Sequence, residues 1–499
     1  MRNNKRKLNS VKFFLAPFLL ALAACSGGRM FGADEGAGYS YAPMARDTKP
    51  QTDTNTYLAI KENDFIKTSV TNKSSFSMCT SNGAYANMAG LIERGIKPSK
   101  DAVIIEQMLN YFTYSYQLNE GENLGVFNEV SDCPWNSEHK LASVAVKAKE
   151  VTSTGNFNFV FLIDVSGSMY EEMGNVKTCF TTLIKGLSDN DRVSIVTYAS
   201  GVSTVVDGAS AKDKDTLIEK VNGLMASGST NGSGGIQKAY EIASKHLING
   251  GNNRVILATD GDFNVGISKT SDLEKFIANK RDSGIYLSVI GFGMGNYHDS
   301  TAQTLARNGN GNVFYVRNQN DAKNLFVNGL SSMFEVVSKD TKTQVVFDVN
   351  QVDSYRLLGY ENALLTEAEF NDSNKDAGEV LSGDVTVAMY EILLKENADL
   401  TKSLFTTEIH FKDPKTNEDK VIKNERAIYN SNGSMDFVFQ SAVVEFGLLL
   451  RDSAYKGEAS YDHILDVYAN NGGDYSNDEN KVKFFELVTK AKQIVNQNY

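Results

Sequence analysis

The stretch Asp164-Val165-Ser166-Gly167-Ser168 follows directly after the apolar run Phe157–Ile163 and decides the fold. A short apolar run that ends in turn-forming residues predicts a buried strand. The turn after this strand carries one carboxylate and two hydroxyls, on Asp164, Ser166 and Ser168. Such hard oxygen donors suit Mg²⁺ or a similar cation. Ordinary strand-end turns are also rich in serine, so this stretch needs support from the rest of the chain.

Two positions further along the chain extend this group. Thr230 lies in Gly228-Ser229-Thr230-Asn231-Gly232, and Asp260 ends a second expected buried strand, Arg254–Thr259, before Gly261. The complete set resembles the metal-ion-dependent adhesion site of von Willebrand factor type A (VWA) domains: Asp164, Ser166, Ser168, Thr230 and Asp260. The alternative interpretation is a set of ordinary turns at strand ends.

The resemblance implies how these residues would bind a metal ion. Ser166, Ser168 and Thr230 would supply neutral hydroxyls directly, while Asp164 and Asp260 would act partly through bound waters. Mg²⁺ prefers six oxygen ligands at about 2.0–2.1 Å. With few direct negative charges the ion stays electron-poor, and an acidic side chain of a protein partner completes its shell. We therefore expect Mg²⁺ as the cofactor, with Mn²⁺ or Ca²⁺ as alternatives.

The segment around these motifs alternates between strand and helix patterns. Apolar runs typical of strands occur at Phe157–Ile163, Val193–Tyr198, Val202–Val206, Val255–Ala258, Tyr286–Ile290 and Val313–Val316. Helical patterns occur at Asp215–Met225, Gly234–Leu247, Leu273–Arg281 and Asp321–Val337. The alternation predicts an α/β fold with a doubly wound, mostly parallel six-stranded sheet. The third run follows Ser200-Gly201 and is expected to be an antiparallel edge strand. In such sheets ligands bind beyond the carboxyl ends of the strands, where Asp164 and Asp260 stand.

At 499 residues the chain is expected to contain two or three domains. We expect a lipoprotein signal peptide at 1–24, a flexible tether at 25–55, an N-terminal flanking segment at 56–154, a VWA-like metal-binding domain at 155–337 and a C-terminal β-rich and helical domain at 338–499. In the N-terminal flank, apolar spacing predicts a helix over 101–112 and a strand at Leu141–Lys149.

The C-terminal flank shows strand patterns followed by helical ones. Strands are predicted at Thr343–Val349, Ser354–Gly359, Asp384–Leu394 and Leu404–Phe411, and helices at Phe437–Leu450, Tyr461–Tyr468 and Lys481–Val495. Because strand patterns lie on both sides of the central segment, we expect that segment to be inserted into a β-sandwich built by both flanks. Integrin β chains have this arrangement, which supports the expectation by analogy.

The first residues of the chain predict export and lipidation. A basic start precedes a short apolar stretch, Phe13–Ala24, which is too short to span a bilayer and is typical of a signal peptide. The stretch ends in Leu22-Ala23-Ala24-Cys25, which resembles a bacterial lipobox, so Cys25 is the expected lipidation site. The alternative is a plain secreted protein. Ser26 at the next position favours the outer membrane of the cell envelope.

The charge balance limits the partners. Removal of 1–24 takes away five positive charges and no acids, so the formal charge changes from −11 to −16. This balance disfavours nucleic acid and anionic headgroups as partners. It fits a lipid-anchored protein that binds cations and a protein partner with an exposed acidic side chain.

Three cysteines remain after Cys25. Cys79 and Cys133 both precede the metal motif and are the expected pair if a disulfide forms. Cys179 falls in a helical stripe with Met173, Val176 and other apolar residues, so we predict a buried free thiol there.

Four longer stretches make the resemblance more specific. They are Cys133–Asn136, Leu257–Gly266, Gly291–Tyr297 and Tyr355–Asn362. They look like a family of bacterial lipoproteins, the YfbK-like proteins, in which a VWA domain lies between a characteristic N-terminal segment and a C-terminal domain of unknown function. The likeness covers roughly residues 56–499. It implies fold and location, and little about activity.

Other kinds of site find less support. Gly228–Gly235 is rich in glycine but lacks the Gly-Lys-Ser/Thr ending of a phosphate-binding loop, and Gly291–Asn296 lacks the third glycine of a dinucleotide fingerprint. The five histidines show no zinc spacing, and no nucleophile elbow is present. We therefore expect a protein that is not an enzyme and that binds an acidic group of a protein partner through Mg²⁺. The alternative is a metal-stabilised structural scaffold of an envelope assembly, with a hydrolase as a remote third.

Overall fold

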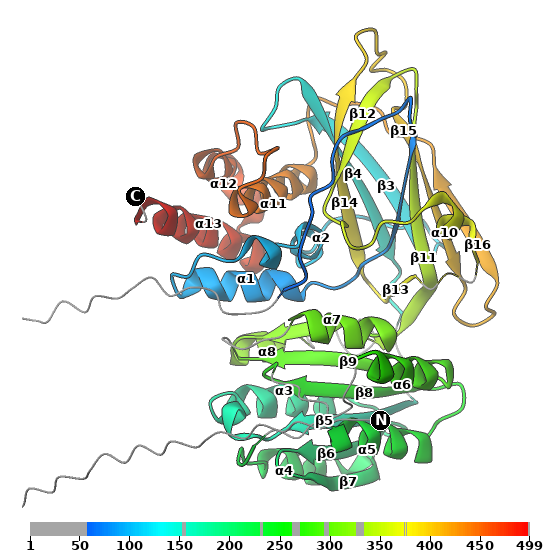
Figure 1. Cartoon of the computed structure of the whole chain (residues 1–499), viewed down its shortest axis with the longest axis vertical. Helices are drawn as coiled ribbons and strands as arrows, with labels where there is room; N and C mark the ends of the chain where they lie inside the picture. The colour runs from blue at the N-terminus through cyan, green and yellow to red at the C-terminus, as the bar shows by residue number, and fades with distance from the viewer. Residues whose placement is uncertain are drawn as a thin grey trace, which may run out of the picture. The chain divides into compact units, whose positions relative to one another are not determined.

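The apolar run of the central motif forms strand β5 (Phe157–Asp164), which lies inside a six-stranded sheet (Figure 1). The computed structural model describes residues 57–151, 156–229, 233–261, 270–293, 299–325, 334–373, 375 and 377–497. All residues of β5 are buried, as expected for a parallel strand that is covered on both faces. Among the described residues, none of the helices combines the length and apolar character needed to span a bilayer.

The sheet has the predicted topology. Its order is β10-β9-β8-β5-β6-β7. The other strands are β6 (Arg192–Tyr198), β7 (Val202–Ser210), β8 (Asn252–Thr259), β9 (Ile285–Phe292) and β10 (Val313–Val316). All neighbours are parallel except β6 and β7, which are antiparallel. The mostly parallel six-stranded sheet and its antiparallel edge strand are therefore confirmed.

Helices cover both faces of this sheet. Successive side chains of each strand point to opposite sides, so each strand contributes apolar side chains to two cores. One face packs against α3 (Met173–Gly186), α4 (Lys214–Asn222) and α8 (Gln319–Asn324). The other packs against α5 (Ser233–Lys245), α6 (Thr270–Asp282) and α7 (Asp299–Asn308). In β5, Phe159 and Phe161 belong to the first core, and Val160 and Leu162 belong to the second.

The two flanks build a pair of antiparallel sheets together. One has the order β1-β12-β14-β4-β3, and the other contains β13-β11-β15-β16 with β2 paired to β11. The strands before β5 are β1 (Ile66–Lys67), β2 (Lys73–Ser77), β3 (Leu124–Asp132) and β4 (His139–Ala148). The strands after β10 are β11 (Val336–Phe347), β12 (Val352–Leu358), β13 (Gly378–Leu381), β14 (Val385–Leu394), β15 (Phe405–Lys412) and β16 (Asp419–Asn424). Each sheet thus takes strands from both sides of the central segment.

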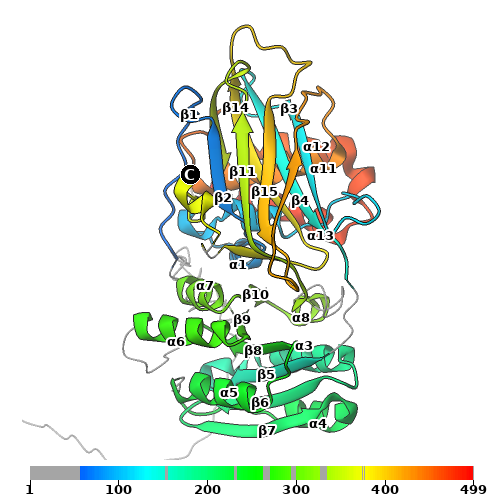
Figure 2. The same ribbon diagram turned by 90° about the vertical axis from the view of Figure 1, so that its right-hand side faces the viewer.

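These sheets face each other across one apolar core. In Figure 2, β2, β11 and β15 form the nearer layer, and β3 and β4 lie behind it. Phe347 of β11 stacks on Tyr355 of β12 with ring centroids 4.2 Å apart, and both belong to the core between the layers. The expected β-sandwich with an inserted central segment is confirmed by this pairing. The limits predicted for the separate parts remain predictions.

Helices cover the outer face of the β1-β12-β14-β4-β3 sheet. They are α1 (Gly83–Glu93), α2 (Ile105–Leu109), α11 (Met435–Arg451), α12 (Tyr461–Tyr475) and α13 (Glu479–Gln497). Leu141 and Ala145 of β4 point into this core, while Val144 points into the sandwich. Trp135, the only tryptophan of the chain, is fully buried in the helical core.

Several predicted elements differ from the structure. The helix predicted over 101–112 is only a turn of 3₁₀ helix (Lys100–Ala102) and the short α2, because Val103 and Ile104 are not helical. The helix predicted to reach Val337 does not, since β11 begins at Val336; residues 326–333 lie outside the described residues. The strand predicted to begin at Thr343 therefore begins earlier. The structure adds strands β1, β2, β3, β13 and β16, helix α1 and the short α10 (Glu367–Asn371), which the apolar patterns did not predict.

Candidate functional site

Asp164 is the last residue of β5, and its carboxylate is buried with none of its surface exposed. One oxygen, Oδ1, accepts a hydrogen bond from the Ser166 backbone N–H at 2.8 Å. The other, Oδ2, is buried without a hydrogen-bond partner among the described residues. A buried carboxylate oxygen without a partner is costly, so a cation or a donor at this position would stabilise it.

The two serines of the motif lie beside this carboxylate. The Ser166 and Ser168 hydroxyl oxygens are 3.0 Å apart, and either one can be the donor. Ser166 is buried and Ser168 is exposed, at the start of a 3₁₀ turn, Gly167–Tyr170, that precedes α3. The serine hydroxyls thus connect the buried carboxylate to the surface.

Asp260 directly follows the neighbouring strand β8. Strands β5 and β8 are parallel with Ile163 opposite Ala258, so Asp164 and Asp260 leave the same edge of the sheet. Burial raises the pKa of Asp164 to about 6, and the negative charge of Asp260 acts in the same direction. The Ser166 hydrogen bonds oppose this shift. The nearby Tyr198 hydroxyl also lowers the Asp164 pKa, although it does not reach Oδ2 with normal hydrogen-bond geometry.

A second loop is held against the motif by its backbone. The Gly167 N–H donates to the Gly228 carbonyl at 2.9 Å, and the Ser227 N–H donates to the Val165 carbonyl at 2.7 Å. Gly228 has a φ of +83°, and a Cβ there would lie 2.5 Å from the Ser200 hydroxyl, so glycine is required. This loop leads directly to Thr230, which lies outside the described residues.

One acidic residue near the motif was not predicted. Burial raises the pKa of Glu172, and the charges of Glu171 and Asp260 act in the same direction, against a hydrogen bond from Asn175. Glu172 also lies against Gly293, whose φ is +78° and whose added Cβ would be 3.1 Å from Glu172 Cγ. Its sequence spacing from the motif matches no ligand pattern, so only the structure shows that Glu172 lies near Asp260.

The described donors at this edge are two carboxylates and two hydroxyls. Asp164, Ser166, Ser168 and Asp260 come from the ends of two adjacent strands, as the sequence predicts. No group of three or more His, Cys, Asp or Glu side chains within the described ranges lies close enough to hold a metal ion. Hard oxygen donors with one unsatisfied carboxylate oxygen fit a cation such as Mg²⁺, provided that hydroxyls complete the set.

The cysteine predictions have mixed outcomes. Cys179 is a buried free thiol on α3, as predicted. The pairing of Cys79 with Cys133 is wrong in this structure, because both are free thiols. Cys133 packs in the helical core and Cys79 against the sandwich core, so each thiol faces different neighbours. Cys25 lies outside the described residues.

Comparisons with known proteins follow the same division of the chain. The family profile described as von Willebrand factor type A domain matches residues 158–328, and that of the C-terminal region of the uncharacterised protein YfbK matches 331–494. A third, described as von Willebrand factor, matches 51–143.

Individual relatives are similar over different lengths. The chain is 32% identical over 418 residues to the uncharacterised protein YfbK of Escherichia coli strain K12, covering 78% of this chain and 73% of that protein. It is 26% identical over 200 residues to inter-alpha-trypsin inhibitor heavy chain H3 of Mus musculus, covering 38% of this chain and 22% of that protein. Among solved structures, a von Willebrand factor type A protein from Catenulispora acidiphila matches with 16% identity and a TM-score of 0.42 over 72% of this chain and 89% of that one.

Proposed function

Because the chain belongs to the YfbK family and carries a VWA domain, a kind of domain that generally mediates protein–protein interactions, we propose that it binds a protein partner through a metal ion. The metal would be Mg²⁺ at the edge formed by Asp164, Ser166, Ser168 and Asp260, with Thr230 as a further hydroxyl donor. The partner would supply an acidic side chain. This role is that of a binding protein rather than an enzyme.

The buried carboxylate of Asp164 is the observation that supports the proposal most strongly. Its Oδ2 has no hydrogen-bond partner among the described residues, while the Ser166 and Ser168 hydroxyls lie 3.0 Å apart beside it. A hard cation bound by these oxygens would offset the cost of burying the charge.

The chemistry of the donors explains why an acidic partner is expected. When bound, Mg²⁺ would act as an electron-poor centre, because hydroxyls neutralise none of its charge. The chain's own part is to hold the donors in place. Ser166 N–H fixes the Asp164 carboxylate, and the Gly167–Gly228 backbone bond holds the two loops together. A partner carboxylate could then bind without rearrangement of the strands.

The N-terminal sequence supports a location for this activity. The lipobox Leu22-Ala23-Ala24-Cys25 would place the mature protein on the cell envelope through a lipid on Cys25, at the outer membrane. The partner would then be another protein of the envelope. The net charge of −16 for residues 25–499 fits a solvent-facing protein that does not bind nucleic acid.

The proposal is tested by capture of partners from the native envelope in Mg²⁺ or in EDTA, followed by mass spectrometry. A partner that is retained by the wild type in Mg²⁺, and lost in EDTA and with Asp164→Ala, supports it. Asp189→Ala is a matched control, since Asp189 is an exposed aspartate of the same domain. A partner that stays bound in EDTA, with the fold intact, would favour the scaffold role instead.

A further inference from the structure

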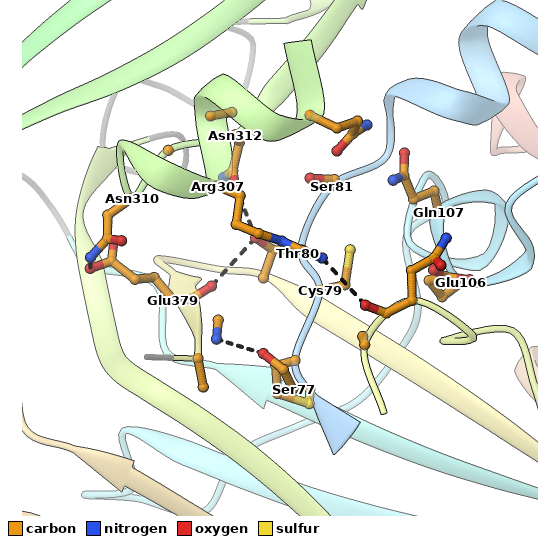
Figure 3. Close-up of a pocket in the computed structure, with 18 of the residues that line it drawn as sticks. Ser77, Cys79, Thr80, Ser81, Glu106, Gln107, Arg307, Asn310, Asn312 and Glu379 are labelled. Carbon is orange, nitrogen blue, oxygen red and sulfur yellow. Dashed lines mark hydrogen bonds between the residues drawn. The ribbon is translucent and has the colours of Figure 1, made fainter. Parts of the chain in front are cut away.

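A cavity of about 580 Å³, shown in close-up in Figure 3, is lined by none of the candidate metal ligands. It is bounded by the end of β2, by α2, by the α7–β10 connection and by the segment around β13. Its volume falls within the roughly 300–1,000 Å³ of small-molecule sites. Uncharged polar side chains account for much of its lining: Ser77, Thr80, Ser81, Gln107, Asn310 and Asn312.

Gln107 gives this cavity an amide donor on a mostly buried side chain. The side chain is 4% exposed, and its Oε1 accepts a hydrogen bond from the Ala84 backbone N–H at 3.0 Å. That bond fixes the orientation of the amide. Its Nε2 makes no hydrogen bond to the described residues. Because Gln107 lines the cavity, this Nε2 can donate to an acceptor on a ligand there.

Groups of opposite charge line the same cavity. Glu106 is 6% exposed, and its Oε2 accepts from the Tyr360 N–H at 3.0 Å. Burial, and then the charge of Glu361, raises the pKa of Glu106 to about 7, so both of its protonation states are accessible near neutral pH. The Arg307 guanidinium reaches past Thr80 toward the wall that carries Glu106, as Figure 3 shows.

Arg307 is available to a ligand. Its side chain is exposed, and it donates only a long hydrogen bond, of 3.5 Å, to the Asn362 carbonyl. A guanidinium with most of its donors free binds a carboxylate through two parallel hydrogen bonds. The acids Glu106, Glu274 and Glu379 line the same space and would repel a polyanion such as a phosphate chain.

This combination matches the chemistry of a peptide. Side-chain amides and hydroxyls both donate and accept, as the N–H and C=O groups of a peptide require. We infer that this cavity binds a short peptide by its carboxyl-terminal end, with the terminal carboxylate on Arg307 and a peptide carbonyl on Gln107 Nε2. This second binding function is independent of the proposed metal site.

The test is a calorimetric titration of the full chain with Ala-Ala-Ala and, separately, with the same tripeptide as its carboxyl-terminal amide. EDTA is present throughout, so that the metal loops do not contribute. The free acid should bind at one site, and the amide should bind about tenfold or more weakly, because a hydrogen bond to a charged group is lost. Arg307→Ala should weaken binding of the free acid to a similar extent. Arg426→Ala, a change at another exposed arginine, should leave it unchanged.

Three results would overturn the inference. They are no binding of the free acid at millimolar concentration, equal affinity for acid and amide, and undiminished binding by Arg307→Ala. The comparison of acid with amide uses the wild type, so it stays decisive even if a variant is unstable. The titration in EDTA does not depend on metal-dependent partner capture, so failure of one proposal leaves the other standing.

Discussion

Replacement of Glu391 by glutamine should destabilise the sandwich strongly. Glu391 of β14 pairs with Arg356 of β12 at 2.7 Å, and the side chains are both 2% exposed. Its other oxygen contacts His139 Nδ1 of β4 at 2.6 Å. The Arg356 guanidinium also lies 4.3 Å from the centre of the Tyr455 ring. Glu391→Gln therefore leaves a buried cation without its counter-charge.

The size of the effect follows from this burial. Removal of one partner of a buried ion pair costs about 3–5 kcal/mol, whereas replacement of both by apolar residues is often nearly neutral. Arg356→Met with Glu391→Leu should therefore cost less than Glu391→Gln alone. Glu367→Gln is the control, because the Lys73–Glu367 pair is 39% and 64% exposed and should contribute at most about 1 kcal/mol.

Trp135 fluorescence in urea provides the assay. Trp135 is the only tryptophan and is buried in the helical core on this sheet, so its emission reports unfolding of the flanks. Two results would refute the reasoning. The first is a decrease in the free energy of unfolding of less than about 1 kcal/mol for Glu391→Gln. The second is a double variant whose decrease equals the sum of the decreases for Arg356→Met and Glu391→Leu measured separately.

Other predictions concern separate parts of the chain. A hydrogen bond with buried Glu445 raises the pKa of His463, so the stabilising effect of this pair is complete below the unfolded pKa of about 6.5 and is lost as the pH rises through the folded pKa. The melting-temperature difference between wild type and His463→Gln should therefore shrink from about pH 5.5 to 8.5. A constant difference would contradict this. Gly311→Ala should lower the melting temperature, since an added Cβ would lie 1.9 Å from a β9 carbonyl oxygen and overpacking costs about 1–3 kcal/mol. Gly473→Ala is the control, because an added Cβ at that position meets no atom within 4 Å and should not lower it. Equal effects of the two changes would refute the packing argument. Cys25→Ser should abolish lipid labelling and membrane fractionation, and unchanged labelling would rule out lipidation at this residue.

The central sheet could be predicted because its signals are local. The run Phe157–Ile163 is apolar except for Asn158, since helices cover both faces of β5, and the polar residues of the motif begin where the strand ends. Asp164 and Asp260 were placed at one edge by the parallel topology alone. The backbone bond between Gly167 and Gly228 joins residues far apart in sequence, and no local pattern specifies it.

The missed elements lack the usual patterns for physical reasons. In α1 every residue from Gly83 to Ile92 is buried, so no polar face produces a helical period. Strand β16 is an edge strand of mostly exposed residues, Asp419–Asn424, and has no apolar alternation. The free thiols of Cys79 and Cys133 show that sequence proximity to a common motif does not predict pairing, since the two residues pack in different cores.

The most direct test of the central proposal is a calorimetric titration of Mg²⁺ into the wild type and into Asp164→Ala, Thr230→Ala and the Asp189→Ala control, with Mn²⁺ in a parallel series. The account predicts one site in the wild type and in the control, and loss of that site in the other two variants. Their melting temperatures without metal should stay close to that of the wild type, because Asp164 Oδ2 is buried without a partner and the sequence predicts a glycine-rich turn at Thr230. Undiminished Mg²⁺ or Mn²⁺ binding in both Asp164→Ala and Thr230→Ala, or no binding by the wild type, would contradict it.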